Sequence, residues 1–274
     1  MTISVILTTY NRIETTLGAL KNLFESELPK DFSLNVTIAD SNSPDNTLDI
    51  IKSKYPDIRI FNVGDNIFWN EGMTKAWIEA SKSNSDFYLW LNDDTFLFEN
   101  AITELMSDFK SLKDESIIVG VTKDNSSVTY GGRKKRFNNP LIKPNGFPQK
   151  CDFMNGNCVL ISRKIFNKVG FLSPKYKHSL GDFDYGLRAI RLNINIYITS
   201  KIIGKCDHNN FKWYNPSFSF IKRAKFLFIP NGMPLKEYFY FNFNFFGALK
   251  SMMFLASVAC ALFLPNIYIK LTKK

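Results

Sequence analysis

Short apolar runs alternate with helical patterns through the first 120 residues, and this alternation limits the fold more than any other feature of the sequence. The apolar runs are rich in β-branched residues, as is typical of parallel strands that are buried on both faces. Strands separated by helices predict an α/β fold with a mostly parallel central sheet flanked by helices. The expected strands are residues 3–7, 34–39, 58–63, 87–91 and 117–121.

Capping residues predict where several of the helices begin. Asn11, followed three residues later by Glu14, predicts a capping box at the start of the first helix. Ser43, followed by a proline, predicts the start of the second helix. Ser162 is expected to cap a short helix that ends at Gly170.

The expected strands end in polar segments. Ligands of parallel sheets bind outside the carboxyl ends of the strands, so residues 8–12, 40–42, 64–66 and 92–94 are expected to share one site. The adjacent carboxylates in the last segment suit a hard divalent cation, although Asn and Asp also serve turns. The chain contains neither G-x-G-x-x-G nor G-x-x-x-x-G-K-[ST], which disfavours a dinucleotide-dependent dehydrogenase and a P-loop enzyme.

Four segments resemble motifs of the family 2 glycosyltransferases, which have the GT-A fold. They are residues 5–12 for the opening strand and loop, 39–43 for the second-strand motif, 91–94 for the D-x-D motif and 181–188 for the E-D-x-D motif. Asn92 replaces the first Asp of D-x-D, and Gly181 replaces the Glu of E-D-x-D. The resemblance runs from about residue 2 to about residue 210. It implies a Rossmann-like GT-A fold and a likeness to bacterial surface-polysaccharide and rhamnosyltransferase-like enzymes.

The resemblance implies an inverting, metal-dependent hexosyltransferase. Such an enzyme moves a sugar from a nucleotide-diphosphate donor, here of UDP or dTDP type, to a hydroxyl of a glycan or lipid-linked acceptor in surface polysaccharide synthesis. The leaving diphosphate gains negative charge, which a divalent cation (Mg²⁺ or Mn²⁺) neutralises. Asp94 and His208 are the expected metal ligands. The acceptor hydroxyl must lose a proton to a carboxylate, and Asp182 is the expected catalytic base.

The remaining site residues are expected around these. The donor side is expected to include Thr8, Tyr10, Arg12, Asp40, Asn66, Trp69, Gly72 and Asp93, and the acceptor side Asp152, Asn155 and Asp184. Asp40 is expected to accept from the imide N–H of a uracil- or thymine-type base. Trp69 suits either stacking on a sugar ring or packing in the core. Arg188 lies four residues after Asp184, a spacing that suits an intrahelical ion pair, and a contact between Arg188 and a phosphate is the alternative.

The formal charge of +10 falls almost entirely on the C-terminal part of the chain. Residues 201–274 hold 11 of the 35 basic residues but only two of the 25 acidic ones, and they are rich in phenylalanine. Residues 251–269 carry no charge and are flanked by lysines, including Lys273 and Lys274. This run reaches the lower limit for a spanning helix, but Pro265 and Asn266 interrupt it.

A basic, aromatic segment of this kind favours attachment in the membrane interface, where anionic headgroups attract lysine and arginine. The alternative is a helical subdomain or dimer interface, which leaves a homo-oligomer open. The chain is therefore expected to divide into a GT-A glycosyltransferase domain and a helical, membrane-associating tail. The domain covers residues 1–215, with a nucleotide-sugar-binding half at 1–120 and an acceptor-binding half at 121–215, and the tail covers 216–274.

Cysteine usage and the N-terminus bear on the compartment. The four cysteines form no C-x-x-C pair, and the first residues lack the basic region of a signal peptide. The expected location is the cytoplasm, peripheral on the inner face of the cell membrane. The expected partners are the nucleotide-sugar donor, the glycan or lipid-linked acceptor and the membrane surface, without nucleic acid.

Two other functions compete with this interpretation. A sugar-phosphate nucleotidyltransferase would usually open with a glycine-rich phosphate loop, which the sequence lacks. A non-catalytic module would bind nucleic acid through the basic tail, with strong dependence on salt and no role for Asp94 or Asp182.

Overall fold

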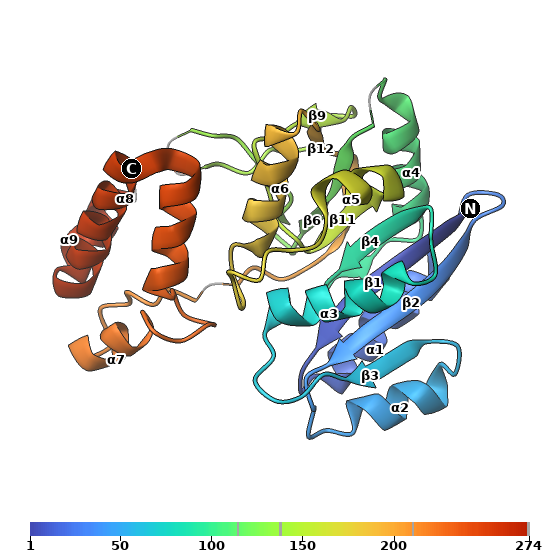
Figure 1. Cartoon of the computed structure of the whole chain (residues 1–274), viewed down its shortest axis with the longest axis horizontal. Helices are drawn as coiled ribbons and strands as arrows, with labels where there is room; N and C mark the ends of the chain where they lie inside the picture. Colours follow the sequence, from blue (N-terminus) through green and yellow to red (C-terminus); the bar gives the residue numbers. More distant parts are fainter. Residues whose placement is uncertain (114, 137–138, 210, 273–274) are drawn as a thin grey trace.

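The computed structural model describes residues 1–113, 115–136, 139–209 and 211–272. Its body is built on a central sheet with the strand order β3-β2-β1-β4-β11-β6-β12-β5 (Figure 1). These strands are β1 (Thr2–Thr9), β2 (Ser33–Asp40), β3 (Arg59–Asn62), β4 (Phe87–Leu91), β5 (Phe96–Leu97), β6 (Ile117–Lys123), β11 (Cys158–Ser162) and β12 (Ile196–Lys205). Four short strands extend it or pair beside it: β7 (Val128–Tyr130), β8 (Gly132–Arg133), β9 (Gln149–Lys150) and β10 (Phe153–Met154).

The strand directions confirm a mostly parallel central sheet. β1 pairs in parallel with β2 and β4, β2 pairs in parallel with β3, and β6 pairs in parallel with β12. β11 is inserted between β4 and β6 and runs antiparallel to both. The five strands expected from the sequence all form.

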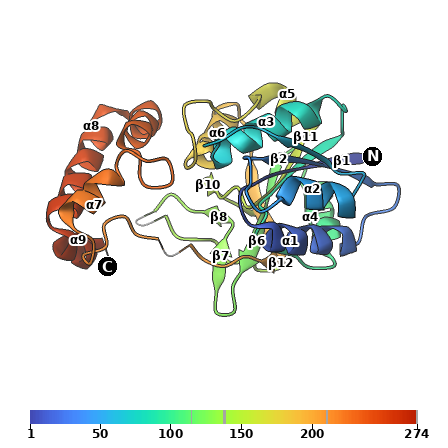
Figure 2. The ribbon, with the colours of Figure 1, turned by 90° about the horizontal axis from the view of Figure 1, so that it is seen from below.

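Helices cover both faces of the sheet, which explains why the strands read as continuous apolar runs. One face packs against α1 (Ile13–Glu25), α2 (Thr47–Lys54) and α4 (Ala101–Ser111), and the other against α3 (Trp69–Ser81), α5 (Arg163–Val169) and α6 (Gly181–Arg191). Figure 2 shows α1 and α4 on one side of the sheet and α3, α5 and α6 on the other. Along β1, Val5 and Leu7 belong to the core on the side of α1, and Ile6 belongs to the core on the side of α3. This is expected because successive side chains of a strand point to opposite faces of the sheet.

The predicted capping box at the start of α1 is wrong. Asn11 has a left-handed backbone (φ 51°), and Arg12 occupies the N-cap without a side-chain bond. The Ile13 N–H donates instead to Asp45 Oδ2 at 2.9 Å. The carboxylate of Asp45, in the loop before α2, therefore caps the start of α1, as Asn11 was predicted to do.

The predicted start of α2 is also displaced. Ser43 donates its hydroxyl to Asp40, and the helix begins after Asn46, which has a left-handed φ of 57°. The predicted cap of α5 is confirmed, because the Ile165 N–H donates to Ser162 Oγ at 3.2 Å. Gly170 follows that helix with φ 79°, a conformation that favours glycine.

The C-terminal residues form a separate helical unit beside the body (Figure 1). It comprises α7 (Phe220–Lys225), α8 (Leu235–Phe263) and α9 (Pro265–Thr272), packed around a small core that includes Trp213, Leu227 and Val258. α9 begins at Pro265, where the sequence predicted an interruption. Lys273 and Lys274 lie outside the described residues.

Among the described helices, α8 is long and apolar enough to cross a membrane by length and composition. Gly247, however, has non-helical angles (φ 82°, ψ 178°) that bend α8 into two segments. At about 1.5 Å per residue these segments measure roughly 18 and 24 Å, and both are shorter than the roughly 30 Å of a hydrocarbon core. Neither segment is therefore long enough by itself to cross that core.

Candidate functional site

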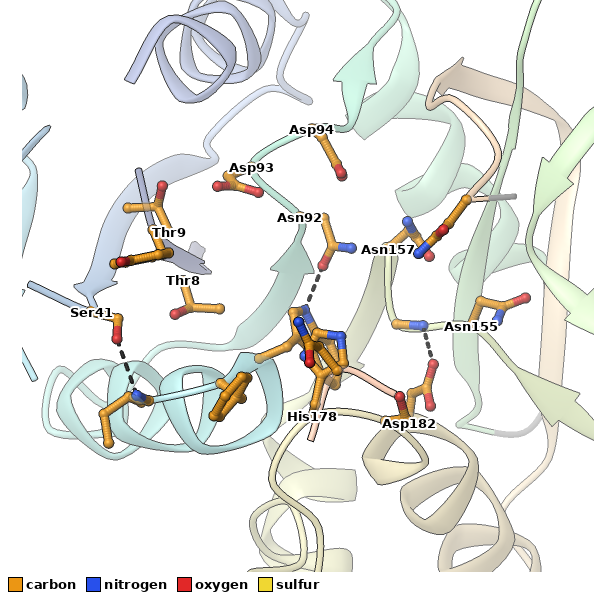
Figure 3. A pocket seen from close by; sticks show the side chains of 18 of the residues that line it. Thr8, Thr9, Ser41, Asn92, Asp93, Asp94, Asn155, Asn157, His178 and Asp182 are labelled. Carbon is orange, nitrogen blue, oxygen red and sulfur yellow. Dashed lines mark hydrogen bonds between the residues drawn. The ribbon is translucent and has the colours of Figure 1, made fainter. Parts of the chain in front are cut away.

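A cavity of about 1140 Å³ opens where the strand ends meet (Figure 3). Its walls come from the segments that follow β1, β3 and β4, from the turn before β11, from the start of α6, and from residues after β12. This is the edge of the sheet that the strand-end rule selects. Segments far apart in the sequence thus converge on one site.

Most of the site residues expected from the sequence line this cavity. They are Thr8, Tyr10, Arg12, Asn66, Trp69, Asp93, Asp94, Asn155, Asp182 and His208. Four others do not line it: Asp40, Gly72, Asp152 and Asp184.

Asp93 and Asp94 meet one guanidinium group at the end of β4. Arg12 Nη1 lies 3.3 Å from Asp93 Oδ1 and 3.2 Å from Asp94 Oδ2. Burial raises the pKa of Asp93 to about 6, while Arg12 opposes that rise. The Asp94 side chain is 41% exposed. Asp94 is therefore the more accessible of the two carboxylates, and Asp93 is the buried partner of Arg12.

Asn92 stands where the D-x-D motif has its first carboxylate, and its amide is held by Trp69. Trp69 Nε1 donates to Asn92 Oδ1 at 2.7 Å, a bond drawn in Figure 3. The Trp69 ring also meets Trp90 edge to face, with 6.3 Å between the ring centroids. Any Cβ at Gly156 would come within 2.6 Å of it. Trp69 thus packs against the core of the body and also lines the cavity.

Asp182 lies in the first turn of α6, on another wall of the cavity. Its Oδ2 accepts from the Gly156 N–H at 2.9 Å and its Oδ1 from the Phe183 N–H at 2.8 Å. Burial raises the pKa of Asp182 to about 6, while these N–H groups and Arg133 oppose the rise. A base with such a pKa is ionised at neutral pH and still binds a proton well, which suits general base catalysis.

The residue before this helix has an unusual backbone. Leu180 occupies the N-cap of α6 with φ 71°, a left-handed conformation that is rare for a bulky side chain. Backbone strain of this kind concentrates at functional sites. Leu180 also lines the cavity, two residues before Asp182 in the chain.

The expected metal ligands do not form a protein-only metal site. Within the described ranges, no group of three His, Cys, Asp or Glu side chains is placed to hold a metal ion. His208 lines the cavity but stacks on Tyr130, with 6.0 Å between the ring centroids. Mg²⁺ is commonly held by one or two carboxylates together with substrate phosphates. The exposed carboxylate of Asp94 fits a cation that arrives with a diphosphate.

Asp40 and Gly72 have structural surroundings. Asp40 is only 2% exposed, and its carboxylate accepts from the N–H and the hydroxyl of Ser43. Its neighbour Ser41 lines the cavity in its place. Gly72 packs against β1, where any Cβ would lie 2.1 Å from Thr8 Oγ1. Gly72 therefore permits the contact that positions Thr8.

Asp152 and Asp184 are engaged away from the cavity. Asp152 accepts from the Lys135 N–H at 2.8 Å. Asp184 is buried, pairs with Arg188 Nε at 2.7 Å and accepts from the Tyr176 hydroxyl at 3.2 Å. Of the two roles that the sequence left open for Arg188, the structure has the intrahelical ion pair.

The cavity is also lined by residues that the sequence did not single out, among them Ser179, Asn231 and Tyr238. Ser179 precedes α6, and Asn231 and Tyr238 belong to the C-terminal unit. Spacing in the sequence gave no sign of the last two, because nothing in the tail's pattern indicates that it packs against the body.

Comparisons with known proteins bear on the family and the fold. Residues 4–170 match the family model described as Glycosyl transferase family 2. No curated protein matches the sequence significantly.

Several solved structures share the fold. S. aureus TarS 1–349 in complex with UDP-GlcNAc has a TM-score of 0.59 and 14% identity, covering 96% of this chain and 82% of TarS 1–349. The complex of TarS 1–349 with UDP gives 0.57 and 16%, covering 90% and 73%. The mannosyltransferase PcManGT from Pyrobaculum calidifontis, in complex with GDP-Man and Mn²⁺, gives 0.54 and 15%, covering 99% and 83%. At these identities the likeness concerns the fold alone.

Proposed function

The chain belongs to glycosyl transferase family 2 and has the GT-A fold, and we propose that it transfers a sugar from a nucleotide-diphosphate sugar to a hydroxyl group with inversion. One observation carries the proposal. A carboxylate with a pKa of about 6, Asp182, faces the same cavity as the Asp93–Asp94 pair and its arginine. One end of the cavity thus offers a base, and the other offers groups that suit a diphosphate.

Asp182 takes the proton of the acceptor hydroxyl. The acceptor oxygen forms a bond to the anomeric carbon while the bond from that carbon to the diphosphate oxygen breaks. The electron pair of the broken bond leaves with the diphosphate, and the proton stays on Asp182 Oδ1 or Oδ2 until it passes to water. Attack opposite the leaving group inverts the anomeric carbon.

Arg12 and Asp94 are the residues of this chain that act on the diphosphate. The guanidinium of Arg12 is half-exposed and can extend a hydrogen bond to a phosphate oxygen while it keeps Asp93. Asp94 would hold a divalent cation, which neutralises the leaving group when it is bound. Thr8, Ser41 and Asn66 would contact the nucleoside of the donor. The proposed donor is of UDP or dTDP type.

The tail, residues 216–274, is proposed to attach the 1–215 domain to the cytoplasmic face of a membrane, where surface polysaccharide precursors would be extended. More than half of the exposed large apolar side chains in the described part of the chain lie in this tail. It carries basic residues such as Lys222 and Lys250 beside them. Apolar area and positive charge together favour an anionic bilayer.

A donor panel tests the activity. UDP-glucose, UDP-GlcNAc, a dTDP-sugar and GDP-mannose are each incubated with the protein, with and without Mg²⁺ or Mn²⁺, and release of the nucleoside diphosphate is measured. Release from at least one donor, increased by the metal, is expected. No release from any donor, with or without acceptor glycosides, contradicts the proposed function.

Vesicle sedimentation tests the attachment. The most exposed residues around the bend of α8 are Leu249, Met252 and Met253, at 73%, 68% and 64%. Their triple change to serine is expected to reduce binding to phosphatidylglycerol vesicles at least about tenfold, because apolar burial drives it. Phe147→Ser, at a 73% exposed site on the body, is the matched control and is expected to bind normally. Equal binding by both variants contradicts this attachment surface.

A further inference from the structure

The C-terminal unit contributes directly to the wall of the cavity. Asn231 and Tyr238 line it together with Ser179 and Asp182 of the body. Figure 1 shows the first half of α8 on the side of the body that carries α6, the helix that begins with the proposed base. The unit that we propose for membrane attachment is therefore also part of the site.

Contacts on either side of Tyr238 fix the first half of α8 against the body. Glu237 accepts from the Lys177 N–H at 3.2 Å. Arg191 Nη2 donates to the Asn244 carbonyl at 2.6 Å, and its guanidinium lies 4.4 Å from the centre of the Phe245 ring. These contacts span more than one turn of the helix. The tail thus has a defined position at the cavity.

The side chain of Tyr238 contacts both the body and the second half of α8. It lines the cavity together with Ser179, in the loop that leads to Asp182, and the Ser179 side chain is near enough to act on the Tyr238 hydroxyl. The Tyr238 ring stacks on Phe254 from the second half of α8, with 6.1 Å between the centroids and 12° between the planes. Burial raises the pKa of the hydroxyl, and the charge of Asp182 adds to this rise. The hydroxyl therefore stays protonated near the base.

The same helical segment carries exposed aromatic residues on another face. Phe239 and Phe243 are 37% and 56% exposed and stack on each other at 6.1 Å. Successive helical residues differ by about 100° around the axis, so these rings point away from the direction of Tyr238. A helix is only about 10 Å wide. The cavity wall and an apolar surface are thus separated by one helix.

We propose that Tyr238 positions the acceptor for Asp182, and that the acceptor is a sugar carried on a membrane lipid. The hydroxyl of Tyr238 shares hydrogen bonds with Ser179 and a sugar hydroxyl, and orients the attacking oxygen toward the base. The lipid part of the acceptor stays in the bilayer on which the outer face of α8 rests. This inference rests on the proposed function, and Tyr238 itself neither gains nor loses a proton.

The test uses the full-length protein and two acceptor probes with the same sugar. One is a hexadecyl glycoside in phosphatidylcholine–phosphatidylglycerol vesicles, and the other is the methyl glycoside in solution, each offered as glucoside, galactoside and N-acetylglucosaminide. Tyr238→Phe removes the hydroxyl and keeps the stacked ring. Tyr240→Phe is the matched control on the same helix, since its 40% exposed side chain does not line the cavity.

Tyr238→Phe is expected to raise the acceptor KM roughly two- to tenfold, the range for one lost hydrogen bond. The donor KM and vesicle binding are expected to stay unchanged. Ser179→Ala should raise the same KM, and the double variant should add little, because both changes remove one connected pair. Tyr240→Phe should behave like the wild type.

The outcomes separate the inference from the proposed function. If the wild type releases nucleoside diphosphate but does not prefer the hexadecyl glycoside, the lipid-borne acceptor is rejected. If Tyr238→Phe leaves the acceptor KM unchanged, or raises the donor KM equally, its positioning role is rejected. If the wild type releases no nucleoside diphosphate with any probe, the proposed function fails, and the inference fails with it.

Discussion

Replacing Asp182 with asparagine tests the chemistry most sharply, because the substitution keeps the shape of the side chain and removes its basicity. A positioned general base contributes about 100- to 10,000-fold to a rate, so Asp182→Asn is expected to reduce kcat by that factor. Donor affinity should persist, since Asp182 lies on a different wall from the Asp93–Asp94 pair. Asp152→Asn, the same change outside the cavity, is the control and should leave kcat unchanged.

The raised pKa of Asp182 also sets a pH dependence. With a pKa of about 6 the carboxylate is about nine-tenths ionised at pH 7 and about one-tenth ionised at pH 5. Transfer by the wild type should therefore fall about tenfold over that interval, whereas an ordinary aspartate would remain ionised. Asp93, with a pKa of about 6, titrates in the same range. Donor affinity measured across this range in Asp182→Asn isolates the contribution of Asp93.

Loss of activity in Asp182→Asn should not come from unfolding. A carboxyl whose pKa is raised by about two units costs about 3 kcal/mol of stability at pH 7, and this cost disappears as the pH falls below 6 toward 4. The neutral amide removes the cost. It accepts from only one of the two N–H groups, however, and the unsatisfied one costs about 1–3 kcal/mol. The terms nearly cancel, so Tm should shift by only a few degrees.

The assay follows nucleoside diphosphate release and product formation from pH 5 to 8 for the wild type and both variants, with a thermal melt of each. A wild-type rate that is flat between pH 5 and 7, or an Asp182→Asn variant with more than about one-tenth of wild-type kcat, would refute the assignment of the base.

Three other substitutions test the surroundings of the site. Asp94→Ala is expected to weaken metal-dependent UDP binding at least about tenfold by calorimetry, because it removes the exposed carboxylate for the cation; unchanged affinity would exclude it as a ligand. Arg12→Ala should lower the free energy of unfolding by about 1–2 kcal/mol in urea, since it leaves Asp93 buried without its cation, and full stability would contradict the pairing. Gly72→Ala should lower that free energy by about 1–3 kcal/mol through its clash with Thr8, and an unchanged urea midpoint would argue against that close contact.

The sheet could be predicted from the sequence because strands buried on both faces leave continuous apolar runs. The position of β11 could not be, since strand order depends on contacts between segments that are distant in the sequence. The predicted cap of α1 failed for the same reason. Asp45 comes from another loop to meet the Ile13 N–H, and a local reading offered only Asn11. Ser162 succeeded because its partner, Ile165, lies three residues away.

Some features of the candidate site could likewise be predicted from the sequence, and others could not. The strand-end rule brought Arg12, Asp93 and Asp94 to one cavity, because it depends only on sheet topology. Asp182 lies on a helix of the same cavity and was expected instead from the resemblance of residues 181–188 to the E-D-x-D motif. The strand-end rule could not give the direction of each side chain. Asp40 turns to Ser43 rather than to the cavity. Tyr238 escaped prediction because its place depends on how the tail packs against the body.

The most direct test of the central claim is the product itself. Wild-type protein, the best donor of the panel and a glycoside acceptor are incubated together, and the new linkage is identified by proton NMR alongside nucleoside diphosphate release. We expect one glycosidic bond for each nucleoside diphosphate released in acceptor-dependent turnover, with the anomeric configuration opposite to that of the donor, and almost none with Asp182→Asn. Retention of the donor's configuration, or a normal yield from that variant, would contradict the account.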